Sequence, residues 1–222
     1  MRTRGYAGIV FLLIACLTFV ACNIDVSVDV GVRGSGDLIV ESRDVSGFDE
    51  IVVLGSGEVI ITVTGTESLM IQAEDNIMPL LTTEVRGGRL ELGSEESFST
   101  TRGITYTITA ADLAGVEING SGDITASGID TDTFEVTIDG SGNVVPAGSA
   151  NEITVEINGS GEYDGEGLIA PLGSVEVSGS GSVLINATDE LDVGISGSGD
   201  VTYIGAPSVT EHISGSGSVS RR

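Results

Sequence analysis

The 222-residue chain contains no lysine and no tryptophan, one histidine, and two cysteines, Cys16 and Cys22, that both lie near its N-terminus. Because no cysteine follows Cys22, the rest of the chain forms no disulfide and has no thiol chemistry. A Ser-His-Asp relay has only one possible centre, His212, close to the C-terminus. Aromatic residues make up 4% of the chain, which leaves few flat side chains for stacking on sugar rings.

Basic residues are also scarce, since 9 arginines stand against 33 acidic residues and the formal net charge is −24. A chain this acidic repels nucleic acid and anionic headgroups, so no nucleic-acid partner is expected. Neither Arg nor Lys occurs between Gly103 and Ser220, which removes the cationic base that a β-helical polysaccharide lyase needs. Glycosidases use a pair of carboxylates, and acids are abundant here without any distinctive pair.

The most regular feature that is present is the tripeptide Gly-Ser-Gly, which occurs eight times. The copies begin at Gly34, Gly55, Gly120, Gly140, Gly159, Gly179, Gly197 and Gly215. The last six copies start 20, 19, 20, 18 and 18 residues apart, a period typical of the coils of a solenoid. Apolar and polar residues alternate on both sides of each tripeptide, which predicts strand, glycine corner and strand in every repeat.

Equivalent residues of successive parallel coils lie about 4.8 Å apart, so inward columns can be assigned by aligning the repeats. Three columns are predicted: Ile118, Ile138, Ile157, Val177, Ile195 and Ile213; Val116, Val136, Val155, Val175 and Val193; and Ile124, Val144, Tyr163, Val183, Val201 and Val219. In the final repeat, Glu211 stands where the second column expects a valine. This substitution suits a terminal coil whose inner face is partly open to water.

The alternation extends toward the N-terminus through Leu69–Ala73 and Arg89–Leu92, with less regular corners. A polar stretch from Glu95 to Thr101 is predicted to be a loop, and residues 76–82 to contain a short helical turn. No linker separates domains. We therefore expect an all-β fold, a parallel β-solenoid of about nine to ten rungs with an 18–20-residue repeat.

A predicted secretory leader precedes this domain. Arg2 and Arg4 come before an apolar run from residue 7 to residue 21, which is shorter than the roughly 20 residues of a membrane span. The run ends at Phe19-Val-Ala-Cys22, which resembles the lipobox of bacterial lipoproteins, although Leu13-Ile-Ala-Cys16 is a closer match. We favour Cys22 because cutting at Cys16 leaves a short hydrophobic core and an apolar mature start.

This interpretation divides the chain into a signal peptide (1–21), a first rung after the anchor (22–37) and the β-helical domain (38–219). It predicts an extracytoplasmic protein of the bacterial envelope, on the outer membrane, the cell surface or the periplasmic side, that touches the membrane through its lipid alone. An uncleaved anchor or a plain secretory peptide is the alternative.

Polar residues beside the tripeptides are the candidate ligand contacts. Asp123, Glu162 and Asp200 directly follow a copy, and Asp139 directly precedes one. Carboxylates on neighbouring coils could share calcium, which takes six to eight oxygens at about 2.4 Å. Because Asn, Ser and acid alternate in these columns, we expect at most weak, distributed calcium binding and no other cofactor.

A second candidate is a recognition strip for a repetitive ligand such as a glycan. It comprises Asn119, Ser121, Ser141, Asn158 and Ser160. The competing interpretation is that small residues are needed wherever the chain turns and coils pack closely.

Several motifs, in order, resemble one known family. They are Arg43-Asp-Val-Ser-Gly-Phe-Asp-Glu-Ile-Val-Val53, Leu69-Met-Ile-Gln-Ala-Glu-Asp-Asn76, the repeats of the type Glu-Ile-Asn-Gly-Ser-Gly-Asp, and Tyr203-Ile-Gly-Ala-Pro-Ser-Val209. Over residues 38–219 the chain resembles the "putative auto-transporter adhesin, head GIN domain" family. The resemblance implies a right-handed, single-stranded parallel β-helix on an exported envelope protein, without catalytic or binding residues to carry over.

The expected function is therefore a non-catalytic, adhesin-like binding or structural module of the envelope. A glycan or a surface protein of the envelope or host is the expected partner. A polysaccharide-processing enzyme, either a lyase or a glycosidase, is the alternative.

Overall fold

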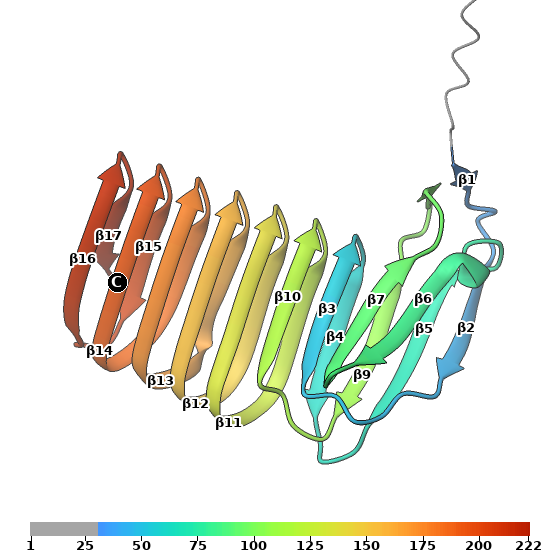
Figure 1. The fold of residues 1–222 in the computed structure, drawn as a ribbon, viewed down its shortest axis with the longest axis horizontal. Helices are drawn as coiled ribbons and strands as arrows, with labels where there is room; N and C mark the ends of the chain where they lie inside the picture. Colours follow the sequence, from blue (N-terminus) through green and yellow to red (C-terminus); the bar gives the residue numbers. More distant parts are fainter. Residues whose placement is uncertain (1–30) are drawn as a thin grey trace, which may run out of the picture.

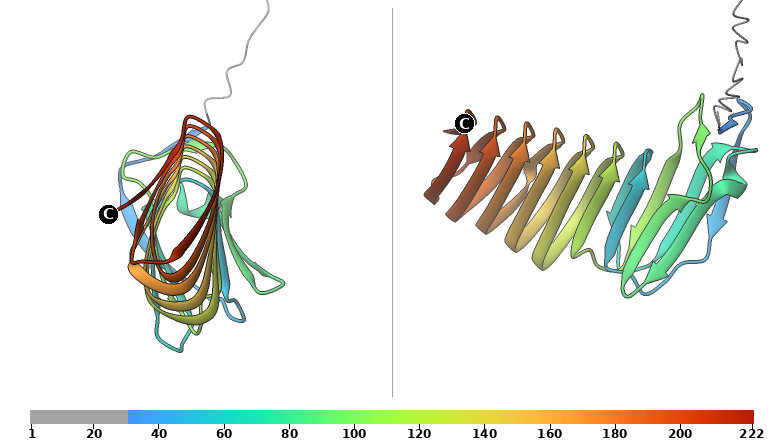
Figure 2. Two further views of the ribbon diagram at one scale, coloured as in Figure 1. Left: turned by 90° about the vertical axis from the view of Figure 1, so that its left-hand side faces the viewer. Right: turned by 45° about the horizontal axis from the view of Figure 1, so that its top comes forward.

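The computed structural model describes residues 31–222, so Cys16, Cys22 and the predicted signal peptide lie outside the described residues. Each repeat forms one strand that leads into its Gly-Ser-Gly corner and one strand that leaves it. The strands that lead into corners make one wide side of a flattened rod, here called face A. The strands that leave corners make the opposite side, face B, as the end-on view in Figure 2 shows.

Eight parallel strands form the regular part of the rod (Figure 1). They are β10 (Gly115–Gly120), β11 (Asp123–Gly140), β12 (Asn143–Gly159), β13 (Glu162–Gly179), β14 (Ser182–Gly197), β15 (Asp200–Ile204), β16 (Ser208–Gly215) and β17 (Ser218–Arg221). Strands β11 to β14 each bend from face B to face A. The first glycines of the corners pair in register from Gly120 to Gly215, which makes about five turns.

One further corner lies on the N-terminal side of this stack. Strands β3 (Glu50–Gly55) and β4 (Glu58–Val63) pair in parallel with β10 and β11, so that Gly55 lies beside Gly120. The chain then leaves the stack after Val63 and returns at Gly115. Residues 64–114 are therefore an insertion between two adjacent coils.

The insertion and the preceding residues form a cap at one end of the rod. The cap consists of β1 (Val32–Arg33), β2 (Leu38–Arg43), β5 (Ser68–Glu74), the 3-10 helix η1 (Met78–Leu80), β6 (Leu81–Arg86), β7 (Arg89–Ser94), β8 (Phe98–Ser99) and β9 (Thr105–Ala110). Strand β5 is antiparallel to both β2 and β9, and β6 is antiparallel to β7. Within residues 31–222, no helix is long and apolar enough to cross a membrane.

The expected count of nine or ten rungs is wrong, because the strands of the cap do not coil. Gly87 and Gly88 both have positive φ and join β6 directly to β7 as a hairpin, a connection that reverses the chain. Alternation of apolar and polar residues is the same in parallel and antiparallel strands, so the pattern alone does not separate a coil from a hairpin. The short helical turn predicted within residues 76–82 is confirmed at η1.

The inward columns are confirmed by the strand register. Ile118, Ile138 and Ile157 align on consecutive coils, and each is fully buried. Glu211 aligns with Val193 and lies on the exposed last coil, as predicted. Tyr163 is also buried in its column, and its hydroxyl has no hydrogen-bond partner within residues 31–222. Burial raises the pKa of that hydroxyl, so the phenol stays neutral.

A buried carboxylate holds the start of the described chain against the cap. Glu74, at the end of β5, is fully enclosed. Its Oε1 accepts hydrogen bonds from the Gly36 amide at 2.7 Å and the Thr101 hydroxyl at 2.6 Å. Its Oε2 accepts from the Thr100 hydroxyl at 2.7 Å and the Thr101 amide at 3.0 Å. The first Gly-Ser-Gly, at residues 34–36, thus binds this carboxylate instead of stacking on the other corners.

These donors lower the pKa of Glu74 to about 2, with the Thr101 hydroxyl as the largest cause, followed by the Thr100 hydroxyl. A depressed pKa stabilises the folded state above the unfolded value near 4.5, and that contribution is lost as the pH falls from 4.5 toward 2.

We therefore expect the free energy of unfolding to fall as the pH is lowered from 4.5 toward 2, and Glu74→Gln to remove part of this decline. Urea titrations at pH 7, 4 and 3 measure it. An unchanged decline in Glu74→Gln, relative to the exposed control Glu96→Gln, would contradict the assignment.

Candidate functional site

The stacked tripeptides form one narrow border of the rod, which we call the corner edge. It comprises residues 55–57, 120–122, 140–142, 159–161, 179–181, 197–199 and 215–217, at the top of Figure 1. The first glycine of each of the last six corners has a φ between 134° and 145°, a conformation that favours glycine.

Close stacking explains why both glycines are needed. A Cβ on Gly140 would overlap the carbonyl oxygen of Gly120 one coil below. A Cβ on Gly142 would lie 2.5 Å from the carbonyl oxygen of Gly122 and 2.8 Å from Ile118 Cγ2. The coils are joined here by backbone hydrogen bonds, such as the one that the Ser141 amide donates to Gly120 at 2.9 Å. The two glycines are therefore dictated by backbone packing.

The serines are different, because packing leaves their side chains outside. The seven corner serines are all exposed, and within residues 31–222 none of their hydroxyls makes a hydrogen bond to protein. They are Ser56, Ser121, Ser141, Ser160, Ser180, Ser198 and Ser216. Ser121, Ser141 and Ser160 of the predicted strip thus lie in one line, one coil apart, with donors and acceptors free for a ligand.

Asn119 and Asn158 of the predicted strip lie beside these serines, on face A. The Asn119 amide donates to Glu117 at 2.6 Å. The Asn158 amide donates to both Asp139 and Glu156, at 2.9 Å each. Asn158 therefore cross-links two acidic side chains, whereas Asn119 binds Glu117 alone, and the side-chain carbonyl oxygens of both remain as acceptors at the border of the strip.

The calcium candidates are not brought together. Asp139 precedes its corner and lies on face A, whereas Asp123, Glu162 and Asp200 follow theirs and lie on face B. On face B, Asn143 separates Asp123 from Glu162 and donates to Asp123 at 2.7 Å. Within residues 31–222, no group of three or more His, Cys, Asp or Glu side chains is placed to hold a metal ion. Weak binding by separate carboxylates stays a prediction.

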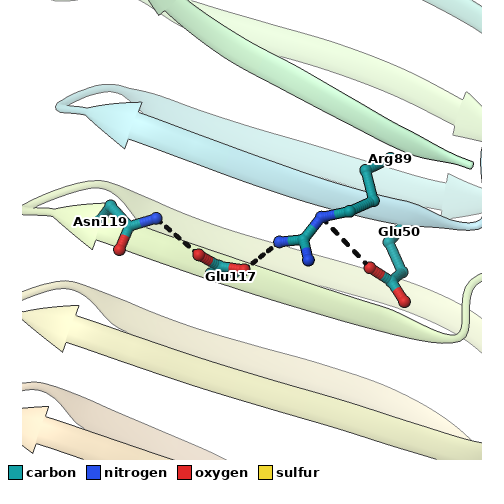
Figure 3. A network of polar contacts seen from close by, with 4 residues as sticks. All are labelled: Glu50, Arg89, Glu117 and Asn119. Atoms are coloured by element: carbon teal, nitrogen blue, oxygen red, sulfur yellow. Dashed lines mark hydrogen bonds and ion pairs between the residues drawn. The ribbon is translucent and has the colours of Figure 1, made fainter. Parts of the chain in front are cut away.

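A polar network on face A joins the cap to the first coils, as Figure 3 shows. Arg89 on β7 hydrogen-bonds Glu117 on β10, and its Nε lies 3.5 Å from Glu50 on β3. The hydrogen bond to Glu117 raises the pKa of Arg89, so the guanidinium stays charged. This cation was not among the predicted site residues. Its positive charge offsets the acidic side chains at the border between the cap and the coils. The 118 residues from Gly103 to Ser220 contain no Arg or Lys that could do the same.

The last coils carry two shallow, open depressions on face A, of about 600 and about 460 Å³. His212 lines the larger one together with Glu176 and Asp192. Within residues 31–222, no hydrogen bond or ion pair joins His212 to a serine or a carboxylate. The arrangement is therefore not an assembled Ser-His-Asp relay.

The polar loop predicted at Glu95–Thr101 contains the short strand β8 and the two threonines that bind Glu74. Its described contacts are structural. Glu74 itself was missed in the sequence, because nothing local separates it from its neighbour Asp75.

The sequence profile of one family, described as "Putative auto-transporter adhesin, head GIN domain", matches residues 47–207, which is more than half of the chain. The chain belongs to this family. The match covers β3 through β15, so the head GIN domain comprises most of the cap and nearly the whole coil. An auto-transporter adhesin acts outside the cytoplasm, so membership implies an extracytoplasmic location. The family description names adhesion and no catalytic activity.

Three crystal structures are similar to this head GIN domain protein. A "putative adhesin" from Bacteroides fragilis is 24% identical with a TM-score of 0.68, covering 86% of this chain and 100% of its own. A "putative lipid binding protein" from Parabacteroides distasonis is 23% identical with a TM-score of 0.58, covering 86% and 99%. A "putative adhesin" from the same species is 22% identical with a TM-score of 0.57, covering 86% and 99%. At these identities the likeness establishes the fold alone.

No match was found among curated proteins.

The corner geometry predicts a sharp contrast between adjacent residues. Gly140→Ala should lower the unfolding free energy by about 2–4 kcal/mol, because the new Cβ adds backbone strain and a clash with the coil below. Ser141→Ala, one residue on, should change it by less than about 0.5 kcal/mol. Urea unfolding followed by circular dichroism measures both. Equal effects of the two substitutions would show that backbone packing does not dictate the tripeptide.

Proposed function

We propose that this head GIN domain protein is a lipid-anchored, non-catalytic adhesive module of the cell envelope, and that the corner edge is its recognition surface. The observation that carries the proposal is the line of exposed serines whose hydroxyls make no hydrogen bond within residues 31–222. They recur once per coil, a rise of about 4.8 Å, along one border of a stiff rod. Such a ladder suits a ligand that itself repeats, and a glycan has that property.

The neighbouring rows support a polar ligand of this kind. On two coils the Asn119 and Asn158 side-chain oxygens border the serines on face A, so an amide acceptor lies beside a hydroxyl donor there. Few aromatic side chains are available for stacking. Recognition would therefore depend on many weak hydrogen bonds, and its strength would come from the number of coils engaged.

The position of the chain ends sets how an anchor at Cys22 would orient the rod. The first described strand, β1, lies in the cap, and the C-terminus lies at the opposite end of the rod (Figure 1). A lipid on Cys22, nine residues before Gly31, would therefore join the membrane to the cap end. The coils and their corner edge would project away from the bilayer.

Paired serine substitutions test the recognition surface. Ser141→Ala/Ser160→Ala should weaken glycan binding by about tenfold, because two hydrogen bonds worth about 0.5–1.5 kcal/mol each are lost. Ser149→Ala/Ser174→Ala, at exposed serines away from the corner edge, is the matched control. A glycan array with titration of the best hit measures both. Equal affinity of the two double variants would reject the corner edge as the binding surface.

Metabolic labelling tests the anchor. Labelled palmitate should be incorporated by the wild type and by Cys16→Ala, and not by Cys22→Ala, because only the cysteine at the cleavage site is acylated. Loss of label in Cys16→Ala alone would assign the anchor to Cys16. Absence of label in the wild type would overturn the lipoprotein proposal. Protease digestion of whole cells then reports whether the coils reach the cell exterior.

A further inference from the structure

The two ends of the rod differ, because one is covered by the cap and the last coil at the other is uncovered. At the cap end, Ile77 and Met78 are buried at η1, and the cap strands β7 and β9 pair with the coil strands β3 and β4. At the other end, β16 pairs only with β14 and β17 only with β15 among the described residues. Figure 1 shows this last coil as the outermost layer. One edge of each strand therefore keeps backbone donors and acceptors that another strand can use.

The inner side of this open coil carries an apolar, acidic, apolar row. Val209, Glu211 and Ile213 align with Leu191, Val193 and Ile195 of the coil below. Those three are at most 1% exposed, whereas Ile213 is 42% exposed. Glu211 makes no ion pair within residues 31–222. The end of the core is thus an incomplete layer with a carboxylate at its centre.

The Glu211 carboxylate favours some partners over others at the open edge of the last coil. If two copies met through their last coils, the antiparallel register that covers Val209 with the partner's Ile213 would place the two Glu211 carboxylates opposite each other. Like charges directly opposite across strands are destabilising, so Glu211 disfavours a second copy at this end. A strand with a cation in the same slot would instead gain an ion pair, and apolar residues on either side of it would cover Val209 and Ile213.

The side chains around the last coil also favour a positively charged partner strand. Glu190 and Asp192 line the depressions beside β16, and Glu176 and Glu211 line the larger of them. The cationic side chain nearest in sequence, Arg221 on β17, makes no ion pair within the described part of the chain. Acidic walls around an open edge attract a basic segment and repel an acidic one.

We propose that the last coil is a docking site for an extended, basic segment of a partner protein, which adds as a strand to the free edge of β16. In such strand addition, main-chain hydrogen bonds supply affinity and alternate side chains supply specificity. The partner segment carries a basic residue opposite Glu211 and an apolar residue two positions before and after it. This site is independent of the corner edge, and either can fail without the other.

Charge-matched peptides test the site. The probes are fluorescein-labelled Thr-Val-Thr-Arg-Thr-Val-Thr and the same peptide with Glu in place of Arg, each titrated into the purified full-length protein by fluorescence anisotropy. The Arg peptide should bind at least about tenfold more tightly than the Glu peptide. Glu211→Arg should reverse this preference. Glu211 is exposed, so the variant should fold, and far-UV circular dichroism checks this.

Glu156→Arg is the matched control, since it makes the same charge change at an exposed residue in the middle of face A. It should alter binding of the Arg peptide by no more than about twofold. If Glu156→Arg and Glu211→Arg lose the same affinity for the Arg peptide, the binding is general charge attraction and the proposal is overturned. Equal affinity of the wild type for the two peptides, or no binding of either peptide, would also overturn it.

Light scattering after size-exclusion chromatography tests the competing occupant. The wild type should be monomeric, and Glu211→Val should self-associate. A wild type that dimerises, and that Glu211→Arg makes monomeric, would assign the last coil to a second copy and overturn the proposal.

Discussion

The close approach of consecutive corners is the constraint on which the rest of the rod depends. From Gly120 onward, each first glycine leaves no room for a Cβ above the carbonyl of the corner below, and the amide of the following serine bonds to that carbonyl. This contact fixes both the rise and the register of every coil. The buried columns on the inside and the serine line on the outside are consequences of the same register, because equivalent residues repeat at one spacing along the rod.

Register also limits what the outer surface can carry. In the face A row that contains Glu117, the following coils present Thr137, Glu156, Glu176, Gly194 and His212. Like charges directly above one another are destabilising, and polar or small residues interrupt most of the acidic run. Asn158 bridges Asp139 and Glu156, whereas Glu156 and Glu176 are register partners with no bridging donor within residues 31–222. Spacing, amides and, at the cap, Arg89 therefore relieve the negative charge in part, and the pair Glu156 and Glu176 keeps its repulsion.

Much of the coil could be predicted because its contacts are repeated copies of one local pattern. Aligning the tripeptides was enough to place Ile138 above Ile118 and Glu211 at the open end. The cap could not be predicted in the same way, since its strands look like coil strands in sequence and only the reversed direction of β5 and β6 sets them apart. For the candidate site, the serine line follows from register alone. Asp139 and Asp123 were grouped as ligands although Asp139 precedes a corner and Asp123 follows one, and a corner always puts its two flanks on opposite faces. The enclosure of Glu74 depends on Gly36 and Thr101, which are remote in sequence, so only the fold reveals it.

The hydrogen bonds between coils run along the length of the rod, because strands lie across it and pair with the strands on either side (Figures 1 and 2). If one end is fixed to a membrane and the other holds a ligand, tension acts directly along these bonds. Coils are bound mainly to their immediate neighbours, so they would release one at a time from the uncapped end. Each released coil of 18–20 residues adds roughly 60 Å of extended chain. A rod held at both ends in this way would therefore lengthen coil by coil under load.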